Sequence, residues 1–211
     1  MLNRIYARAL FPWLLERLLG TPEIGKLRRE ALYAAAGHTL EIGFGTGLNL
    51  PYFPPTVTQL TVVDTEQMLE SVVAGRVAAA GIPVERIWID PRQQLPFPDQ
   101  HFDCIVTTFT LCTIEQPEQT LAEIRRLLRP TGSYIFLEHG RSEHPKIAAW
   151  QDRLNPLQRI AGAGCNLNRP IDKLLTRSGL QIEQLDRFLL PRAPRLVGEA
   201  YRGIARRGQT L

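Results

Sequence analysis

Three glycines at alternate positions, Gly43, Gly45 and Gly47, are the residues of this chain best suited to hold a ligand. They follow an apolar run that begins near residue 38. Because glycine lacks a Cβ, it adopts backbone angles that other residues avoid and lets a ligand approach the main chain closely. The glycines are expected to turn the chain from a strand into a helix, whose first N–H groups are free to face the ligand.

Two carboxylates near this loop offer polar partners to such a ligand. Glu41 precedes the glycines, and Asp64 ends the next apolar run. In an open α/β sheet, ligands bind at the carboxyl ends of the strands. Asp64 is therefore placed to accept hydrogen bonds from both hydroxyls of a ribose, and Glu41 to hold the loop or the ammonium of a bound amino acid. The alternative is an ordinary turn, with Asp64 as a helix cap.

The glycine spacing disfavours two common nucleotide sites. The pattern is Gly-x-Gly-x-Gly, whereas dinucleotide-binding proteins use Gly-x-Gly-x-x-Gly, and position 48 is leucine. No Lys-Ser or Lys-Thr pair follows the glycines, as a phosphate-binding loop requires.

Hydrophobic periodicity predicts the elements that must position these residues. Strands are expected at about 38–43, 59–64, 84–90, 102–108 and 133–138, and helices at 4–19, 22–36, 66–80 and from Pro117 to the Pro-Thr-Gly at 130–132. Further helices are expected at 145–160 and 170–178, and a terminal strand pair at about 180–190 and 196–206. This alternation favours a parallel, doubly wound sheet that the terminal pair closes.

Composition narrows the class of partner. The net charge of +4 suits an anionic substrate or a membrane surface. Short basic clusters, such as residues 26–29, are interpreted as solvated faces, and no interleaving of aromatic and basic residues suggests nucleic acid. The cysteines and histidines are Cys104, Cys112, Cys165, His38, His101, His139 and His144. Their spacing shows no metal-ligand pattern, so no metal is expected, and it favours a reduced, cytoplasmic setting.

The N-terminal segment, residues 4–19, has an apolar helical face interrupted by charged residues, so it is not expected to span a bilayer. Packing on the domain or covering the active site is the expected role. Contact with a membrane interface is the alternative, favoured by Trp13 beside basic residues.

Residues 38–140 resemble the class I S-adenosylmethionine (SAM)-dependent methyltransferases, through the glycine loop, Glu41, Asp64 and the stretch 95–103. A narrower likeness rests on motifs at 110–114, 128–132, 137–139, 164–169 and 201–205. These motifs resemble the methyltransferase-like group that includes the animal membrane-associated thiol methyltransferases and their small bacterial relatives. The resemblance implies SAM as cofactor, S-adenosylhomocysteine as product, and a small apolar thiol or sulfide as acceptor.

The resemblance also implies which residues meet SAM. They are Glu41, Gly43, Gly45, Gly47, Asn49, Asp64, Thr65, Met68, Asp90, Pro91, Thr107, Thr108, Phe109 and Cys112. Asp90 would accept the adenine amino group, or it is a surface turn residue before proline. Pro91 departs from the family pattern because proline has no N–H to meet the adenine. Cys112 is alternatively a small packing residue.

Methyl transfer is direct displacement at a sulfonium, so in-line positioning can carry the catalysis, and a base is needed only for a protonated acceptor. His139 is the candidate base. The alternative is that Glu138 and His139 form a structural pair that fixes the loop to the helix after it. By analogy, Trp150, Cys165 and Asn166 line the acceptor pocket, with burial in the core as the alternative for Trp150 and Cys165.

The predicted fold is α/β, with a Rossmann-like seven-stranded, mostly parallel sheet, helices on both faces and a C-terminal antiparallel strand pair. One domain is expected, with residues 1–36 as a helical lid, 37–140 as the SAM-binding core, and 141–211 as acceptor-site helices and terminal strands. The predicted function is SAM-dependent methylation of a small molecule, with a thiol favoured. A lipid-amine or quinone acceptor, and a SAM-binding regulator without catalysis, are alternatives. The N-terminal helix is a possible peripheral membrane contact.

Overall fold

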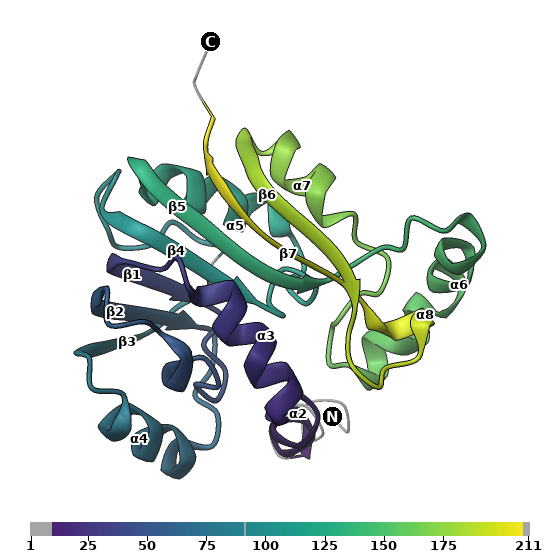
Figure 1. Cartoon of the computed structure of the whole chain (residues 1–211), viewed down its shortest axis with the longest axis horizontal. Coiled ribbons are helices and arrows are strands. Elements are labelled where there is room, and N and C mark those ends of the chain that lie inside the picture. Colours follow the sequence, from purple (N-terminus) through teal and green to yellow (C-terminus); the bar gives the residue numbers. More distant parts are fainter. Residues whose placement is uncertain (1–9, 91, 209–211) are drawn as a thin grey trace.

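A seven-stranded sheet organises the computed structural model, which describes residues 10–90 and 92–208 (Figure 1). The strands are β1 (Gly37–Ile42), β2 (Val57–Asp64), β3 (Val84–Trp88), β4 (Phe102–Thr108), β5 (Leu128–His139), β6 (Leu180–Leu189) and β7 (Glu199–Arg207). Their order is β3-β2-β1-β4-β5-β7-β6. The first five strands pair in parallel, and β7 runs antiparallel to both β5 and β6. The predicted sheet is thereby confirmed.

Helices cover both faces of this sheet. They are α2 (Phe11–Leu19), α3 (Pro22–Leu32), α4 (Glu70–Ala79), α5 (Pro117–Leu127), α6 (Pro145–Ala161), α7 (Ile171–Arg177) and α8 (Arg195–Gly198), with the short 3-10 helix η2 (Leu50–Tyr52). Figure 1 shows α3 in front of the sheet, α5 and α7 behind it, and α6 beyond the ends of the strands. None of the helices in the described part of the chain combines the length and apolar character needed to cross a membrane.

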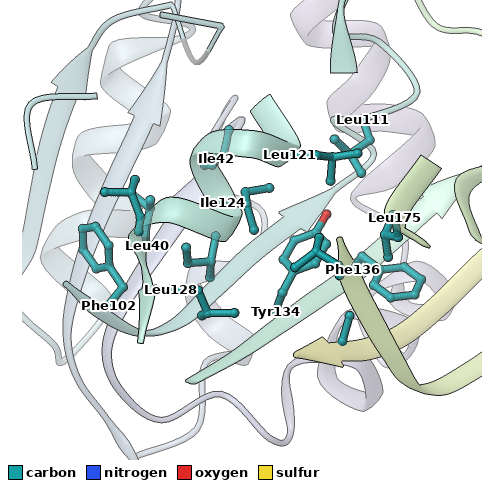
Figure 2. Packing of buried hydrophobic residues seen from close by; sticks show 14 of the residues in the cluster. Leu40, Ile42, Phe102, Leu111, Leu121, Ile124, Leu128, Tyr134, Phe136 and Leu175 are labelled. Atoms are coloured by element: carbon teal, nitrogen blue, oxygen red, sulfur yellow. The ribbon is translucent and has the colours of Figure 1, made fainter. Parts of the chain in front are cut away.

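Side chains that alternate along the strands build a separate hydrophobic cluster on each face. On one face, Leu40 and Phe136 belong to the cluster that contains Leu121 of α5 (Figure 2). On the other face, Ile135 belongs to the cluster that contains Leu32 of α3. Ile135 and Phe136 are neighbours on β5, so this one strand joins both layers of helices to the sheet.

The order of the strands creates a switch point between β1 and β4. The chain leaves β1 towards β2 and β3 on one side, then crosses to β4 and β5 on the other. Loops that follow β1 and β4 therefore diverge, and ligands bind in the crevice that opens between such loops.

Two helix boundaries differ from the sequence prediction. The helix expected at 66–80 begins at Glu70, because Leu69 adopts a left-handed conformation with a φ of 41°. Met68 therefore lies in the loop after β2. The helix expected at 22–36 ends at Leu32, and residues 4–9 of the helix expected at 4–19 lie outside the described residues.

Two strand boundaries were also wrong. The predicted helix end at 130–132 is part of a strand, because Leu128 already has an extended backbone with a ψ of 128° and pairs with Phe102. The strand expected to begin at 196 begins at Glu199, because residues 195–198 form the short helix α8.

Candidate active site

Two of the glycines after β1 have different structural reasons, a close approach at Gly43 and a positive φ at Gly45. A Cβ at Gly43 would lie 2.1 Å from Oγ1 of Thr110, in the loop after β4. Gly45 has a φ of 56°, and no heavy atom lies within 4 Å of the position that its Cβ would take. The Gly45 N–H donates to Oδ2 of Asp64 at 2.7 Å. The loop is thus tied to the end of β2 and leaves space beside Gly45 for a ligand.

The backbone also fixes the orientation of Asp64. The N–H of Thr65 donates to Asp64 Oδ1 at 2.7 Å. Burial raises the pKa of Asp64, and the backbone N–H donors act in the opposite direction. An ionised carboxylate has about four lone-pair sites. The two oxygens can therefore still accept hydrogen bonds from a pair of ribose hydroxyls.

A buried polar cluster of four residues lies between the loop and α3. Asn49 Nδ2 donates to Glu41 Oε1 at 2.7 Å and to Thr108 Oγ1 at 2.9 Å. Arg28 Nη1 donates to Asn49 Oδ1 at 2.7 Å and to Thr108 Oγ1 at 3.0 Å. The cluster therefore joins β1, the glycine loop, the end of β4 and the N-terminal helices.

Two atoms of this cluster have no protein partner. Within the described residues, Glu41 Oε2 and Arg28 Nε are buried and make no hydrogen bond. Leaving a buried polar group unpaired costs about 1–3 kcal/mol, and more for a charged group. An acceptor for Arg28 Nε and a donor for Glu41 Oε2 are what a bound amino acid supplies, through its carboxylate and its ammonium.

Burial also shifts the pKa values of Glu41 and Arg28. It raises the pKa of Glu41 to about 8 and lowers the pKa of Arg28 to about 10. An ammonium group beside Glu41 would favour its ionised form. A zwitterionic ligand would thus match this pair, with its ammonium beside Glu41 and its carboxylate beside Arg28.

Arg28 was missed at the sequence level, where the interpretation of residues 26–29 as a solvated face was wrong for this residue. Its side chain is buried because it shares the inner stripe of α3 with Ile24, Ala31 and Leu32. The helical spacing of that stripe could have indicated it, since an arginine in an apolar stripe needs a buried partner.

The residues expected near the adenine are arranged differently. Asp90 is held by Arg92, whose Nη2 donates to Oδ2 at 2.6 Å and whose Nε lies 3.0 Å from both carboxylate oxygens. Arg92 lowers the pKa of Asp90 and also pairs with Glu115. Pro91 lies outside the described residues. Arg92 is a second residue that sequence reasoning missed, and an adenine contact at Asp90 stays a prediction.

The two threonines at the end of β4 face opposite sides of the sheet. Thr108 joins the polar cluster, whereas Thr107 Oγ1 lies 2.7 Å from the hydroxyl of Tyr134 in the core. Phe109 follows with a φ of 53°. Its ring centroid lies 5.4 Å from the Arg28 guanidinium carbon and 5.0 Å from the centroid of the His139 ring. Phe109 therefore separates the polar cluster from His139.

Glu138 has a structural role in the loop after β4. Its Oε1 accepts the N–H of Thr110 at 3.1 Å, and its Oε2 accepts the N–H of Cys112 at 3.2 Å. Glu138 is thus structural, but it fixes the loop after β4 and not, as the alternative had it, the loop between β5 and the helix that follows.

His139 lies in a group of sulfur side chains that no spacing along the chain indicated. Cys165 Sγ lies 3.7 Å from His139 Nδ1 and 3.6 Å from Cys112 Sγ. The hydrogen bond with Cys165 and burial raise the pKa of Cys112 well above that of an ordinary thiol. Asn166 donates to the Cys112 carbonyl oxygen from its backbone N–H at 2.8 Å and from Nδ2 at 2.9 Å.

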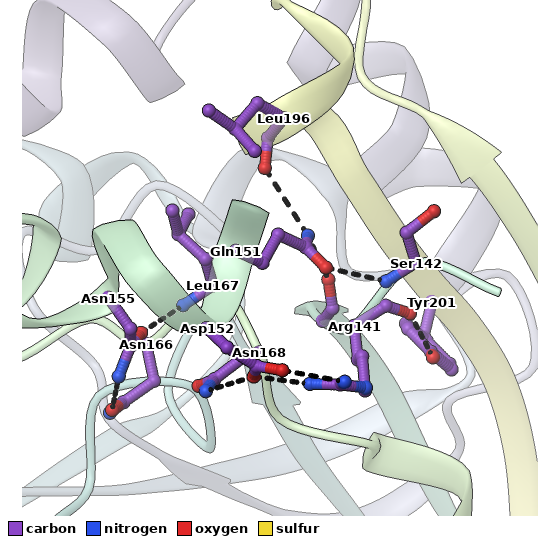
Figure 3. Close-up of polar contacts among 11 residues, drawn as sticks. Arg141, Ser142, Gln151, Asp152, Asn155, Asn166, Leu167, Asn168, Leu196 and Tyr201 are labelled. Atoms are coloured by element: carbon purple, nitrogen blue, oxygen red, sulfur yellow. Dashed lines mark hydrogen bonds and ion pairs between the residues drawn. The ribbon is translucent and has the colours of Figure 1, made fainter. Parts of the chain in front are cut away.

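Asn155 of helix α6 holds Asn166 and Leu167, the two residues that follow Cys165 (Figure 3). Asn155 Nδ2 donates to Asn166 Oδ1 at 3.0 Å, and Asn155 Oδ1 accepts the N–H of Leu167 at 2.9 Å. On the same helix Trp150 is 53% exposed, and burial of Trp150 in the core was therefore wrong. Its indole stacks instead near Arg153, whose guanidinium carbon lies 5.4 Å from the ring centroid.

The fold and the site together define a class of protein. A glycine loop, a ribose-type carboxylate and a buried pair suited to an amino acid, all at the switch point of this sheet, are what a SAM-dependent methyltransferase requires. Residues 40–136 match the family described as methyltransferase domain. The chain belongs to the SAM-dependent methyltransferases and is therefore an enzyme.

Individual relatives agree with this class. The thiol S-methyltransferase TMT1B of Homo sapiens is 31% identical over 169 residues, which cover 76% of this chain and 69% of that protein. The phosphatidylethanolamine N-methyltransferase of Cereibacter sphaeroides is 29% identical over 138 residues, covering 64% of this chain and 68% of that protein. In fold, the chain is similar to 1,6-didemethyltoxoflavin-N1-methyltransferase of Burkholderia thailandensis, solved with S-adenosylhomocysteine. The TM-score is 0.68 at 18% identity, over 99% of this chain and 88% of that one.

Proposed function

We propose that this enzyme transfers the methyl group of SAM to a small, apolar thiol. The observation that carries the proposal is the position of His139, between the Phe109 ring and the thiols of Cys112 and Cys165. Similarity to a thiol S-methyltransferase supports the same acceptor. A site lined by sulfur and an aromatic ring suits an apolar acceptor better than a charged one.

The residues that would hold SAM are those whose polar atoms can still form hydrogen bonds. Glu41 Oε2 takes the ammonium, Arg28 Nε takes the carboxylate, and Asp64 takes the ribose hydroxyls. The fit rests on the unpaired buried atoms of Glu41 and Arg28 and on the open space beside Gly45. When bound, SAM supplies a methyl group on an electrophilic sulfonium.

His139 would prepare the acceptor in this proposal. A thiol is a weak nucleophile until it loses its proton. Because Nδ1 faces Cys165, we assign Nε2 as the atom that accepts the proton of the acceptor thiol. Phe109 and the loop fixed by Glu138 would hold the acceptor in line.

The N-terminal helices would act as a lid over this site, within the single domain proposed for residues 1–211. Contacts from α2 support this role. Arg76 Nη1 of α4 lies 2.7 Å from Oε1 of Glu16, and the hydroxyl of Thr46, in the glycine loop, donates to the same oxygen. The lid is thus attached to the loop that would hold the cofactor.

A second acceptor class, a lipid amine, is favoured by one observation. Leu10, Trp13, Leu14 and Leu18 are exposed on and beside α2, which gives this helix an apolar outer surface. Such a surface suits contact with a membrane interface. A relative named as a phosphatidylethanolamine N-methyltransferase supports the same alternative. The absence of disulfides among the three cysteines supports a reducing, cytoplasmic setting for either acceptor.

The test measures S-adenosylhomocysteine formation by the purified enzyme with SAM and a small alkyl thiol. We expect product that depends on the thiol and none with the alcohol of equal chain length. His139→Ala should lower kcat by about 100-fold, the lower range for loss of a general base, while the Kd for SAM is unchanged. His139→Asn, which keeps a polar side chain of similar size, should not restore the rate.

Two results would contradict parts of this proposal. A sample that binds SAM yet gives no thiol-dependent product would exclude the thiol, and product with phosphatidylethanolamine vesicles would then assign the lipid amine. A rate that is independent of pH and of His139 would exclude the histidine as base.

A further inference from the structure

We propose that Cys112, His139 and Cys165 form a binding site for a soft divalent metal ion, with zinc as the ion that suits it best. The three side chains come from the loop after β4, the end of β5 and the segment between α6 and α7. Their ligand atoms all lie within 4.8 Å of one another. Thiolate and imidazole are the donors that zinc prefers in proteins.

Two of the three distances between donor atoms are close to those that a tetrahedral ion needs. With zinc bonds of about 2.3 Å to sulfur and about 2.05 Å to nitrogen, two sulfur ligands lie about 3.8 Å apart, and sulfur and nitrogen lie about 3.6 Å apart. Here the two sulfurs are 3.6 Å apart, and Cys165 Sγ lies 3.7 Å from His139 Nδ1. Cys165 therefore stands close to the bound geometry with respect to both partners, and Cys112 Sγ and a ring nitrogen of His139 lie within 4.8 Å of each other.

The backbone around the cluster is held before any ion binds. Glu138 accepts the N–H of Cys112, and Asn166 donates two hydrogen bonds to the Cys112 carbonyl oxygen. Asn166 is fixed in turn by Asn155 of α6. Such outer contacts orient the ligands and raise the affinity of a metal site.

Charge also favours a metal ion here. Two thiolates neutralise a divalent cation, so the loaded cluster of Cys112, Cys165 and neutral His139 carries no net charge in its buried position. The Arg169 guanidinium donates to the Leu111 carbonyl oxygen, one residue before Cys112. The positive charge of a bound ion would favour thiolates, the form that binds metal.

Three protein ligands leave one tetrahedral position open, which is the pattern of catalytic rather than structural zinc. This consequence rests on the proposed function. The acceptor thiol would displace water from the fourth position and release its proton to solvent. The zinc-bound thiolate would then form its S–C bond as the sulfonium S–C bond breaks, yielding thioether and S-adenosylhomocysteine. In the metal-loaded enzyme the ion would take over activation of the thiol, with His139 as a ligand through Nδ1, and the role of His139 as base would apply to the metal-free enzyme.

Cobalt provides a direct test, since thiolate-to-cobalt charge transfer absorbs in the near ultraviolet. We expect the reduced full-length enzyme, titrated with CoCl2, to show this band with one ion per chain, and ZnCl2 to abolish it. Cys165→Ala and His139→Ala should weaken cobalt binding by about 10- to 100-fold or more, the loss typical when a metal site loses its support. Cys104→Ala is the matched control, because Cys104 is equally buried but lies outside the cluster. Thermal unfolding of each variant checks folding.

A wild-type cobalt spectrum without the charge-transfer band, or zinc affinity equal in wild type and Cys165→Ala, would overturn the site. So would a Cys112–Cys165 disulfide in the enzyme purified under reducing conditions. Metal binding without thiol methylation would support the site and reject only the proposed function. Thiol methylation that survives complete removal of metal by a chelator would reject the role of zinc in the reaction and leave the proposed function standing.

Discussion

The cofactor side and the acceptor side of this active site are assembled in different ways. Glu41, the glycines, Asn49 and Asp64 lie in one stretch of two adjacent strands and the loop between them. Cys112, His139 and Cys165 come from three segments that only the folded chain brings together. When a site lies within one supersecondary unit, the spacing of its residues along the sequence allows it to be predicted. When a site is assembled from segments across the sheet, no such spacing exists.

A substitution on one side should therefore leave the other side unchanged. The largest expected effect is the loss of SAM binding in Gly45→Val. The new side chain meets no protein atom within 4 Å at its Cβ, so it occupies the space left for the ligand. We expect SAM binding to weaken by at least about 100-fold, and the positive φ of 56° to add strain of about 1–2 kcal/mol. Isothermal titration calorimetry measures the first effect and thermal unfolding the second.

The acceptor side should be untouched by this change. The cobalt spectrum assigned to Cys112, His139 and Cys165 should be the same in Gly45→Val as in wild type. Gly75→Val is a matched control, because Gly75 of α4 also has free space around its Cβ position but no positive φ. Normal SAM affinity in Gly45→Val would remove the glycine loop from the cofactor site.

The same contrast explains how much could be predicted from the sequence. Apolar runs located all seven strands, because β1, β4 and β5 each contain a nearly continuous run of buried residues, which is a local signal. Boundaries were wrong where one residue decides the backbone, as at Leu69 with its positive φ. Leu128 entered β5 through its pairing with Phe102, a partner distant along the chain that no local pattern specifies.

Site residues follow the same rule. Glu41 and Asp64 could be identified because the glycines beside them fix where the strands end. The proximity of Cys165 to His139 depends on how α6 holds the segment before α7, and the exposure of Trp150, for which core burial was the alternative, depends on the packing of the same helix. Tertiary packing, not spacing, decides these positions.

Arg28 belongs to the cofactor side, although it lies on α3, outside the stretch of chain that contains Glu41 and Asp64. Arg28→Leu removes the donor that faces the proposed carboxylate of SAM and frees Asn49 Oδ1 of its partner. A hydrogen bond to a charged group contributes about 1.5–3 kcal/mol, so we expect SAM affinity to fall by about 10- to 100-fold. Calorimetry at a fixed salt concentration measures this.

Arg29→Leu is the control for Arg28. Arg29 is its neighbour on α3 but is exposed, with its guanidinium carbon 5.6 Å from the centroid of the Tyr52 ring. SAM affinity should be unchanged in this variant. Equal losses in both variants would mean that general positive charge on α3, rather than a specific contact, attracts the ligand.

Glu41→Gln should have the smallest effect on SAM affinity. This variant also tests directly whether Glu41 loses a proton when SAM binds. Burial raises the pKa of Glu41 from the ordinary 4.5 to about 8, so the carboxyl of the free enzyme is largely protonated at neutral pH. Binding of an ammonium beside Oε2 requires the ionised form and should release nearly one proton. At pH 7 this deprotonation costs about 1.4 kcal/mol, which offsets much of the ion-pair energy. Glu41→Gln should therefore lose only about three- to tenfold in affinity at this pH.

Proton release distinguishes this account from a purely structural role of Glu41. Calorimetry in two buffers of different ionisation enthalpy, between pH 6 and 7, should count close to one proton for wild type and none for Glu41→Gln. The sign for stability follows from the same raised pKa. The stabilising contribution of protonated Glu41 is fully present below about pH 4.5 and is lost as pH rises through about 8. The unliganded wild type should thus lose stability over this window relative to Glu41→Gln. Equal proton counts in both proteins would mean that the ammonium of SAM is held elsewhere.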